Sequence, residues 1–591
     1  MRIVPWILTL VALLAGHALL ADGDDAPQKT EKKTVRLASL SLQGNYPEGT
    51  SAPGLFGEIA PRLADILERL DKAAQDEKLS GLILDLRLSE VGFATTEELR
   101  AAIRRVRAAN KKVYAVVRSA ANRDYLIAAA CDEICIPPAG LLMVNGLQAE
   151  VMFYKGIFDK LGIQAEFMQV GNFKGAAEPY TRSEMSPEFR RQFETVLDDY
   201  YAILVETIAQ DRKLDPGKVK ELIDEGLFTA ARAKEVGLVD RVCYEDQLTD
   251  QLKLALGADE LTIEKDYGKK KLDTDFSGFA GFIKLMEMIS GQQPGKRSTK
   301  ADKVAVIYAV GPIMDDADAT FSMFDSQLVT PDEMIKAIRQ AEDDVTVKAM
   351  VLRVDSPGGS ALASDLIWRE IVRAKKPIVA SMAETAASGG YYISMGADKI
   401  VAEPGTLTGS IGVIGGKFAI EGMLNKFGVN TDVISRGKSA GVFSMTEPFT
   451  EPEREAWQRM MNDIYGQFTS KAADGRKMEP GRLHDLAQGK VYTGRQALAN
   501  GLVDMLGTLG DAVREAKLLA GLKPDDKVEI LNLPKPKSFL DQLLEGPSAS
   551  ASAKANALAP ELVALVKKAS QLRALFSKPA VTLMPFEVRF R

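Results

Sequence analysis

Residues 391–404 read YYISMGADKIVAEP and residues 125–138 read YLIAAACDEICIPP, so one pattern of apolar and acidic residues occurs twice in the chain. Three further pairs follow in the same order: TVRLASLSLQG from Thr34 with KVAVIYAVGPI from Lys303, GLILDLRL from Gly81 with AMVLRVDS from Ala349, and FTAARAKEVGLVD from Phe228 with YTGRQALANGLVD from Tyr492. The members of each pair are 264 to 269 positions apart. Self-similarity at a nearly constant spacing predicts a tandem duplication.

Each copy alternates short runs of Val, Ile and Leu with amphipathic helical patterns, which predicts an α/β fold around a buried sheet. Both copies contain one long apolar stripe at helical spacing. The first stripe comprises Phe193, Val196, Leu197, Tyr200, Tyr201, Leu204, Val205 and Ile208, after Ser186-Pro187 as cap and first-turn proline. The second comprises Trp457, Met460, Met461, Ile464, Tyr465 and Phe468. We interpret both stripes as core packing.

The composition excludes several classes of function. The chain has 591 residues, 46% of them hydrophobic, and a net charge of 75 − 81 = −6. With 7% aromatic residues it offers neither a basic face nor a run of stacking rings for nucleic acid. Its three cysteines, Cys131, Cys135 and Cys243, cannot form a disulfide framework, and no second Cys/His pair stands at zinc spacing. We expect no metal and no organic cofactor.

A leader and several linkers divide the chain. Residues 3–21 are nearly all apolar, which predicts that residues 1–21 are either a signal peptide or a retained N-terminal membrane anchor. An anchored body would lie on the exported, periplasmic side of the cell membrane, and a cleaved one would be secreted or periplasmic. The other predicted segments are a linker at 22–33, a first repeat at 34–256, a connector at 257–302, a second repeat at 303–523, and a tether with an amphipathic tail at 524–591.

The two copies differ at two turns that could carry chemistry. Residues 355–360 read DSPGGS where the first copy reads RLSEVG, so the pair Gly358-Gly359 occurs once. Residues 386–391 read AASGGY where the first copy reads AANRDY, so Ser388 is replaced by Asn122. A serine between small residues at a strand-to-helix turn suits a nucleophile, and glycine N–H groups on a neighbouring strand end suit an oxyanion hole. Their joint presence in one copy predicts a site there.

A serine nucleophile needs a general base, and histidine is scarce. His17 lies in the leader, and His484 lies in a helical stretch that favours a surface position. Lys174 stands among small and apolar residues in GNFKGAA, and burial alone can lower a lysine pKa far enough for base catalysis. Lys438 in RGKSA is the matching lysine of the second copy and is the runner-up base.

These motifs resemble peptidase family S49 in its long, tandem-repeat form, the signal peptide peptidases A. The resemblance is carried by GNFKGAAEPYTRSEMS around Lys174, DSPGGS at 355–360 and AASGGYYISMGADKIVAEPGTLTGSIG around Ser388, and it extends from Lys33 to Lys523. It implies a duplicated ClpP/crotonase-like domain with a Ser-Lys dyad, in which Lys174 is the base and Ser388 the nucleophile. It also implies a membrane-anchored homotetramer that degrades remnant signal peptides.

The implied mechanism is acyl transfer, with the oxyanion held by N–H groups of Gly389 and of Gly358 or Gly359. If eight half-units alternate around the tetramer, Lys438 faces Asn122 of the next chain, and that junction is expected to be inactive. Two other functions stay open. One is a catalytically degenerate, membrane-associated peptide-binding scaffold, against which the intact serine, lysine and glycines argue. The other is a crotonase-type acyl-CoA enzyme, against which the export leader argues.

Overall fold

Two β-sheets form the centre of the computed structural model, which describes residues 32–49, 61–269, 301–316, 327–535 and 581–583. The first sheet has the strand order β10-β1-β2-β3-β5-β9, and the second contains the run β20-β11-β12-β14-β15-β19. All neighbours within these two runs pair in parallel. The strands of the first are β1 (Thr34–Gly44), β2 (Gly81–Ser89), β3 (Lys112–Val117), β5 (Glu133–Ile136), β9 (Arg241–Val242) and β10 (Glu260–Glu264). Those of the second are β11 (Lys303–Val310), β12 (Val347–Ser356), β14 (Ile378–Ala387), β15 (Lys399–Ala402), β19 (Met505–Leu506) and β20 (Glu529–Leu533).

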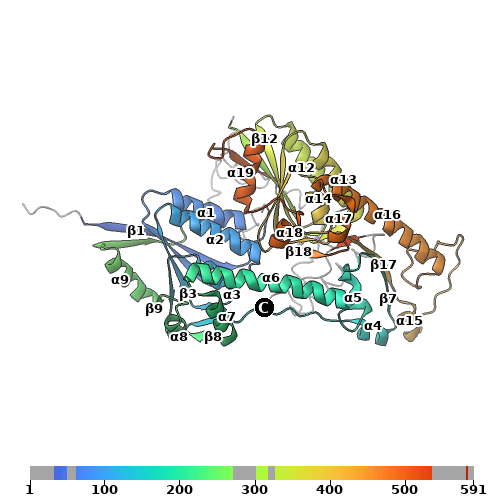
Figure 1. Ribbon diagram of the computed structural model, residues 1–591, viewed down its shortest axis with the longest axis horizontal. Coiled ribbons are helices and arrows are strands. Elements are labelled where there is room, and N and C mark those ends of the chain that lie inside the picture. Colours follow the sequence, from blue (N-terminus) through green and yellow to red (C-terminus); the bar gives the residue numbers. More distant parts are fainter. Residues whose placement is uncertain (1–31, 50–60, 270–300, 317–326, 536–580, 584–591) are drawn as a thin grey trace, which may run out of the picture.

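Helices cover both faces of each sheet, which is why the strands are continuous apolar runs. In β2, Leu82, Leu84 and Leu86 face one core, while Ile83 belongs to another on the opposite face. The helices of the first repeat are α1 (Leu63–Gln75), α2 (Phe93–Ala108), α3 (Asn122–Ala129), α7 (Pro216–Glu225), α8 (Ala230–Glu235) and α9 (Glu245–Ala255). Those of the second are α12 (Pro331–Asp343), α13 (Ala361–Arg373), α14 (Gly389–Ser394), α17 (Pro480–Leu486), α18 (Gly494–Asn500) and α19 (Leu509–Leu519). The two repeats lie side by side in Figure 1.

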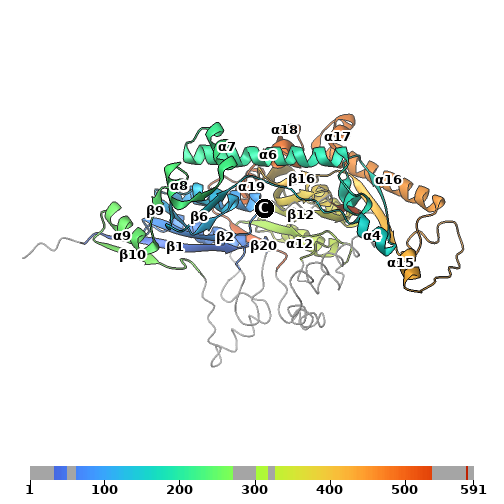
Figure 2. The same cartoon turned by 90° about the horizontal axis from the view of Figure 1, so that it is seen from below.

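The first repeat extends a strand and a helix across the second. Strand β7 (Gln164–Val170) pairs antiparallel with β17 (Val413–Ala419). Helix α6 (Pro187–Arg212) runs along both repeats in Figure 1 and lies beside α17 and α18 in Figure 2. The Gln192 side-chain amide donates to Val491 O at 2.6 Å and accepts from Val491 N–H at 3.0 Å. Tyr200 Oη donates to Gly405 O at 2.8 Å. These contacts fix the segment between β7 and α6 against the second repeat.

The remaining elements form small sheets and short helices at the edges of the repeats. One sheet has the order β13-β21-β17-β7, and another has the order β4-β6-β8. Their further strands are β4 (Ser119–Ala120), β6 (Leu141–Val144), β8 (Gly226–Thr229), β13 (Gly358–Ser360) and β21 (Val581–Leu583), while β16 (Leu407–Gly409) and β18 (Val491–Thr493) extend the second large sheet. The further helices are α4 (Lys155–Leu161), the 3-10 turn η1 (Gly175–Ala177), α5 (Glu178–Thr181), α15 (Glu421–Lys426) and α16 (Glu451–Arg476).

Both apolar stripes lie on long helices, as the sequence predicts. On α6 the buried members are Phe193, Val196, Tyr200, Leu204, Val205 and Ile208, and on α16 they are Trp457, Met461, Tyr465 and Phe468. Ser186 caps α6 by accepting a hydrogen bond from Phe189 N–H at 3.1 Å, and Pro187 is its first residue. The interpretation of both stripes as packing is confirmed.

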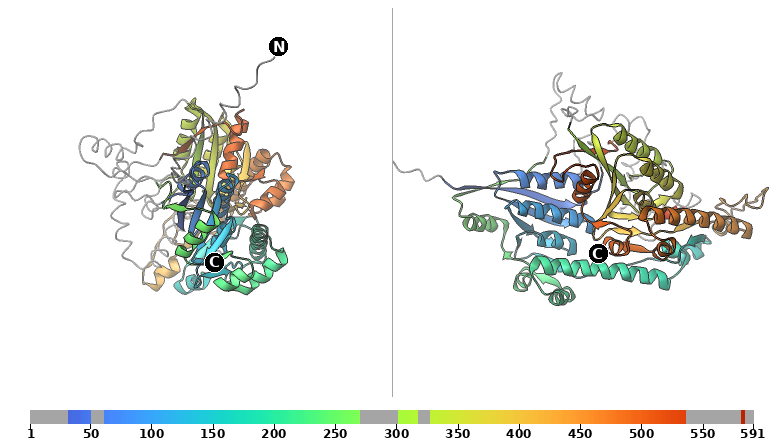
Figure 3. Two further views of the ribbon diagram at one scale, coloured as in Figure 1. Left: turned by 90° about the vertical axis from the view of Figure 1, so that its left-hand side faces the viewer. Right: turned by 45° about the horizontal axis from the view of Figure 1, so that its top comes forward.

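Figure 3 shows the described residues as ribbon. Several predicted segments lie wholly or partly outside these residues. These segments are the leader at 1–21, most of the linker at 22–33, residues 270–300 of the connector and most of the tail. Edge strands β10 and β20 extend the two sheets past the boundaries predicted at 256 and 523. No helix within the described ranges has the length and apolar character needed to cross a bilayer.

Candidate active site

Ser388 lies at the turn between β14 and α14, in a backbone conformation that few side-chain-bearing residues adopt. Its φ is 56° and its ψ is −113°. The Ser388 N–H donates to Gly409 O at 2.8 Å, and the Ser388 carbonyl accepts from Tyr392 N–H at 2.8 Å. Strain of this kind persists only where the surroundings fix it, and it is common at active sites. The turn therefore fixes the direction of the Cα–Cβ bond that carries the hydroxyl.

Lys174 comes from the loop after β7, which docks on a turn of the second repeat. The Phe173 N–H donates to Gln488 O at 2.8 Å. Gly489 has a φ of +78°, and a Cβ there would lie 2.7 to 2.8 Å from Lys174 backbone and side-chain atoms. Only glycine allows this approach. The turn that contains Gly489 also contacts Ser410, whose N–H donates to Lys490 O at 2.6 Å.

The two predicted residues meet within a single chain. Lys174 Nζ lies 2.7 Å from Ser388 Oγ, 2.7 Å from Ser410 O and 2.9 Å from Ser410 Oγ. All three residues are fully buried. A neutral amine has two N–H donors and one lone pair. The two oxygens of Ser410 can accept the donors, so that the lone pair faces the Ser388 hydroxyl.

Burial lowers the pKa of Lys174 well below its usual value, because the ammonium form loses its hydration. Among the described residues, no carboxylate contributes to this pKa. An amine in this setting can accept a proton at a pH where an exposed lysine is already charged. The arrangement can therefore activate a serine without histidine.

Ser410 is the contact residue that the sequence comparison overlooked. It follows Gly409 and has a φ of 52°, which turns both its carbonyl and its hydroxyl toward Lys174. A signal for it is present in the sequence, because aligning 407–412 (LTGSIG) with 141–146 (LLMVNG) places Val144 opposite Ser410. The first copy thus differs at Ser410 as it does at Ser388.

The predicted oxyanion glycines lie beside the serine turn. Helix α14 packs against β13, and a Cβ on Gly390 would lie 2.6 Å from Ser356 O. Gly359 has a φ of +155°, and a Cβ there would lie 1.9 Å from Ile313 O, so the chain requires glycine. The Gly358 N–H donates to Ser356 Oγ at 3.2 Å, whereas Gly389 begins α14, where N–H groups have no intrahelical acceptor.

Part of the C-terminal tail lies on these same elements. Strand β21 pairs antiparallel with β13, with Gly359 opposite Thr582, and pairs with β17 through Ile414 and Val581. Helix α14 also lies against β21. The tail backbone therefore forms a strand across the glycine pair and the start of the serine helix.

A buried ionic cluster underlies the strand that leads to the glycine pair. Arg353 on β12 is fully buried and faces three carboxylates from both repeats, Glu48 at 2.6 Å, Glu98 at 3.1 Å and Glu403 at 4.0 Å. Asp355 follows on the same strand and accepts from Thr385 N–H at 3.1 Å. Burial and the charge of Glu384 raise the pKa of Asp355 to about 7. This carboxyl therefore titrates near neutral pH.

The other candidate residues lie away from Ser388. Lys438 is exposed in the turn after α15, so within one chain Lys174 and not Lys438 contacts the serine. His484 is exposed on α17 and contacts Gln488 at 2.7 Å. Asn122 is buried at the start of α3, where its amide donates to Gly146 O at 2.8 Å.

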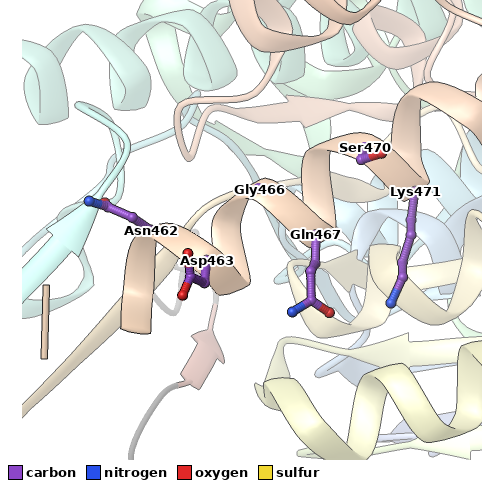
Figure 4. Close-up of a pocket in the computed structure, with 6 residues that line it drawn as sticks. All are labelled: Asn462, Asp463, Gly466, Gln467, Ser470 and Lys471. Carbon is purple, nitrogen blue, oxygen red and sulfur yellow. The ribbon is translucent and has the colours of Figure 1, made fainter. Parts of the chain in front are cut away.

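A surface hollow along α16 has neither Lys174 nor Ser388 in its lining. It is lined by Asn462, Asp463, Gly466, Gln467, Ser470 and Lys471 (Figure 4). Lys471 pairs there with Asp365 of α13. Across the described part of the chain, no three His, Cys, Asp or Glu side chains gather closely enough to hold a metal ion. Neither feature competes with the Lys174–Ser388 site.

Comparisons with known proteins show the family to which the chain is related. The family model of peptidase family S49 matches the chain twice, at residues 105–259 and 370–523. The chain is 32% identical to serine protease SPPA, chloroplastic, of Arabidopsis thaliana, over 88% of this chain and 74% of that protein. It is 33% identical to Protease 4 of Salmonella typhi, over 81% of this chain and 76% of that protein. It is also 35% identical to a putative signal peptide peptidase SppA of Enterococcus faecium, over 36% of this chain and 63% of that protein.

Both family matches fall on the repeated α/β units, one in each copy. The predicted α/β fold in tandem duplication is confirmed, because the family match and the strand order both recur in the two copies. The chain belongs to peptidase family S49 and is a serine peptidase.

Proposed function

We propose that Ser388 and Lys174 form the Ser-Lys dyad of this peptidase, and that its substrates are cleaved signal peptides at the membrane. The observation that carries the proposal is the 2.7 Å contact between Lys174 Nζ and Ser388 Oγ in a fully buried setting. That distance is within reach for direct proton transfer from a nucleophile to its base.

The reaction proceeds by acyl transfer. Neutral Lys174 takes the Ser388 proton while Oγ attacks the peptide carbonyl, and the Lys174 ammonium then protonates the departing amine. The oxyanion forms at the start of α14, where the Gly389 N–H and an N–H from the pair Gly358-Gly359 stabilise it. Water then hydrolyses the ester, with Lys174 again as the base. Ser410 holds the amine through both steps by its two oxygens.

The substrate binds as an extended strand. The place occupied by β21, between β13 and β17, offers backbone groups on both sides and lies against α14. A peptide in this place would gain its affinity from main-chain hydrogen bonds, which tolerate many sequences. This mode suits the degradation of varied leader peptides. The relative named a signal peptide peptidase and the apolar residues 3–21 support the substrate class and the location at the membrane.

The proposal includes a homotetramer in which the half-units alternate around a ring. Lys438 then faces Asn122 of the next chain, which has no hydroxyl to activate. An active-site-directed fluorophosphonate probe should label one serine per chain, and Ser388→Ala should abolish that labelling. Labelling that persists in this variant would contradict a single site per chain.

The decisive experiment compares two matched lysine substitutions. Lys174→Met and Ser388→Ala should each lower kcat/KM on a fluorogenic signal-peptide sequence by about 10³-fold or more, because the two groups act as a unit. Lys438→Met, at the matching exposed lysine, should retain activity. Circular dichroism and thermal melting establish that each variant is folded. Activity retained in Lys174→Met but lost in Lys438→Met would reverse the choice of base. A wild-type protein that binds the peptide without cleaving it would favour the scaffold function.

A further inference from the structure

Two of the three cysteines are in direct contact in the first repeat. Cys135 Sγ and Cys243 Sγ lie 2.7 Å apart, and both side chains are buried. Cys135 is on β5, and Cys243 directly follows β9. These strands are parallel neighbours with Cys135 opposite Arg241, so Cys243, two residues further along, points to the same face of the sheet as Cys135.

Backbone hydrogen bonds hold the two strands together at this pair. The Cys243 N–H donates to Ile136 O at 3.1 Å, which extends the pairing of β5 and β9 by one residue. Cys135 Sγ also lies 3.5 Å from Cys243 O. The sulfurs are packed in an apolar layer under α9, with Val116, Leu248 and Leu252 among their neighbours in the core. The two sulfurs are thus in contact between strands whose backbone pairing is already formed.

Catalysis and metal binding do not explain the pair. The dyad uses neither cysteine, and no metal-binding group of side chains occurs among the described residues. Burial raises the pKa of Cys135, as does the neighbouring Cys243, so the folded protein disfavours the reactive thiolate. Two thiols alone are also too few ligands for structural zinc.

The second copy provides an internal comparison. Val401 occupies the position of Cys135 on β15, and Gly507 occupies that of Cys243 after β19. The Gly507 N–H donates to Ala402 O at 2.9 Å, which reproduces the backbone contact of Cys243. The fold therefore forms this strand pairing without cysteine, so the two cysteines are not required by the backbone geometry.

We propose that Cys135 and Cys243 form a structural disulfide when the chain folds in an oxidising compartment. The oxidant is a disulfide-bonded thiol compound or oxidoreductase, which exchanges with the two thiols in turn. One S–S bond forms in the protein and one breaks in the oxidant. The protein loses two protons and two electrons, and the oxidant leaves as two thiols. The closed loop joins residues 108 positions apart and contains Lys174 together with β7 and α6.

This bond would fix both ends of the segment that delivers the base. It would restrict the unfolded chain across a long loop, which is the usual route by which disulfides stabilise proteins. Cys131 stays a thiol, because it follows α3, outside β5 and β9, and its Sγ contacts Ile127 O at 3.8 Å. The number and spacing of the cysteines exclude a disulfide framework and a zinc site, and they do not bear on a single buried pair.

Thiol counting tests the proposal without reference to activity. The full chain with Ser388→Ala, which avoids self-digestion, is produced once in an oxidising compartment and once in a reducing cytosol. Both samples are denatured and alkylated with iodoacetamide without reductant, and their intact masses are measured. We expect one label on the oxidised protein and three on the reduced protein. Peptide mapping should link Cys135 to Cys243 in the oxidised sample.

Variants assign the labels. In the oxidising compartment Cys131→Ala should take up no label, and Cys135→Ala and Cys243→Ala should each take up two. The oxidised protein should also melt at a higher temperature than the reduced one, and reductant should not change the melting of Cys135→Ala/Cys243→Ala. Three labels on the oxidised Ser388→Ala protein, or a link to Cys131, would overturn the proposal even if every cysteine variant failed to fold.

Discussion

Removing the Ser410 hydroxyl tests whether this residue tunes the general base. Ser410 Oγ lies 2.9 Å from Lys174 Nζ and is one of three oxygens around the amine. Ser410→Ala removes that acceptor but keeps the Cβ, so the strain of the 52° φ is unchanged. The variant thus isolates one hydrogen bond in the immediate surroundings of the base.

The size of the effect follows from the charge that the amine gains. A hydrogen bond to a charged partner contributes about 1.5–3 kcal/mol, against about 0.5–1.5 kcal/mol for a neutral one. The ammonium that develops in the transition state therefore loses about 1–1.5 kcal/mol more than the neutral amine does. That difference lowers kcat/KM by about 5- to 12-fold. It also lowers the pKa of Lys174 further, because the lost acceptor favoured the protonated form.

The assay measures kcat/KM on a fluorogenic peptide from pH 5 to pH 10. We expect two linked changes in Ser410→Ala relative to the wild type. The plateau should fall, and the acidic limb, on which activity rises as Lys174 loses its proton, should shift to lower pH. Ser364→Ala is the control, since Ser364 is also fully buried and donates to Ser360 O at 2.7 Å without contacting Lys174. An acidic limb that stays in place or moves to higher pH in Ser410→Ala would refute the argument.

Two further predictions concern the surroundings of the dyad. Because burial raises the pKa of Asp355 to about 7, the folded protein retains a proton there that the unfolded chain releases, and the free energy of unfolding falls as pH rises from about 4 to 7. Asp355→Asn should remove this slope and raise the free energy of unfolding at pH 8 by at most about 4 kcal/mol, as measured by chemical denaturation. An unchanged slope would count against Asp355 as the titrating group. A chain that ends at residue 580 lacks β21, so it should cleave a short peptide with a lower KM than the full chain, whereas an equal or higher KM would show that β21 does not compete with substrates.

The sequence predicts the parts of the site that differ between the copies and that lie in short motifs. Ser388 stands against Asn122, and the glycine pair occurs once, so both could be found by comparing the chain with itself. The duplication also predicts two equivalent sheets, which the matching strand orders confirm. These features depend on local sequence, and a pattern can report them.

The features that the sequence did not predict depend on contacts between distant segments. The pairing of β7 with β17 joins residues of different repeats, and no local pattern fixes that register. Glu48, Glu98 and Arg353 look like surface charges in the sequence, yet they meet in a buried cluster. Edge strands β10 and β20 are short and follow turns, so they lie beyond the predicted boundaries of the repeats.

The burial of the dyad creates a conflict between chemistry and access. Desolvation lowers the pKa of Lys174, so in the proposed mechanism this residue can act as the base only while water is kept away from it. Ser388 is buried in the same place, and a substrate must nevertheless reach its hydroxyl. A peptide that replaces β21 resolves the conflict, because it brings its carbonyl to the serine and covers the site at the same time.

Substrate length should therefore change the pH dependence of the reaction. A short ester that reaches Ser388 without filling the strand between β13 and β17 leaves Lys174 more hydrated, which keeps the pKa of the amine closer to its usual value. The acidic limb of kcat, which reports groups in the enzyme–substrate complex, should then lie at higher pH for the short ester than for a peptide long enough to span both strands. The comparison uses the chain that ends at residue 580, so that β21 does not cover the site for either substrate. If the two limbs coincide, the substrate does not exclude water from the base, and the buried setting of Lys174 must be maintained by the two repeats alone.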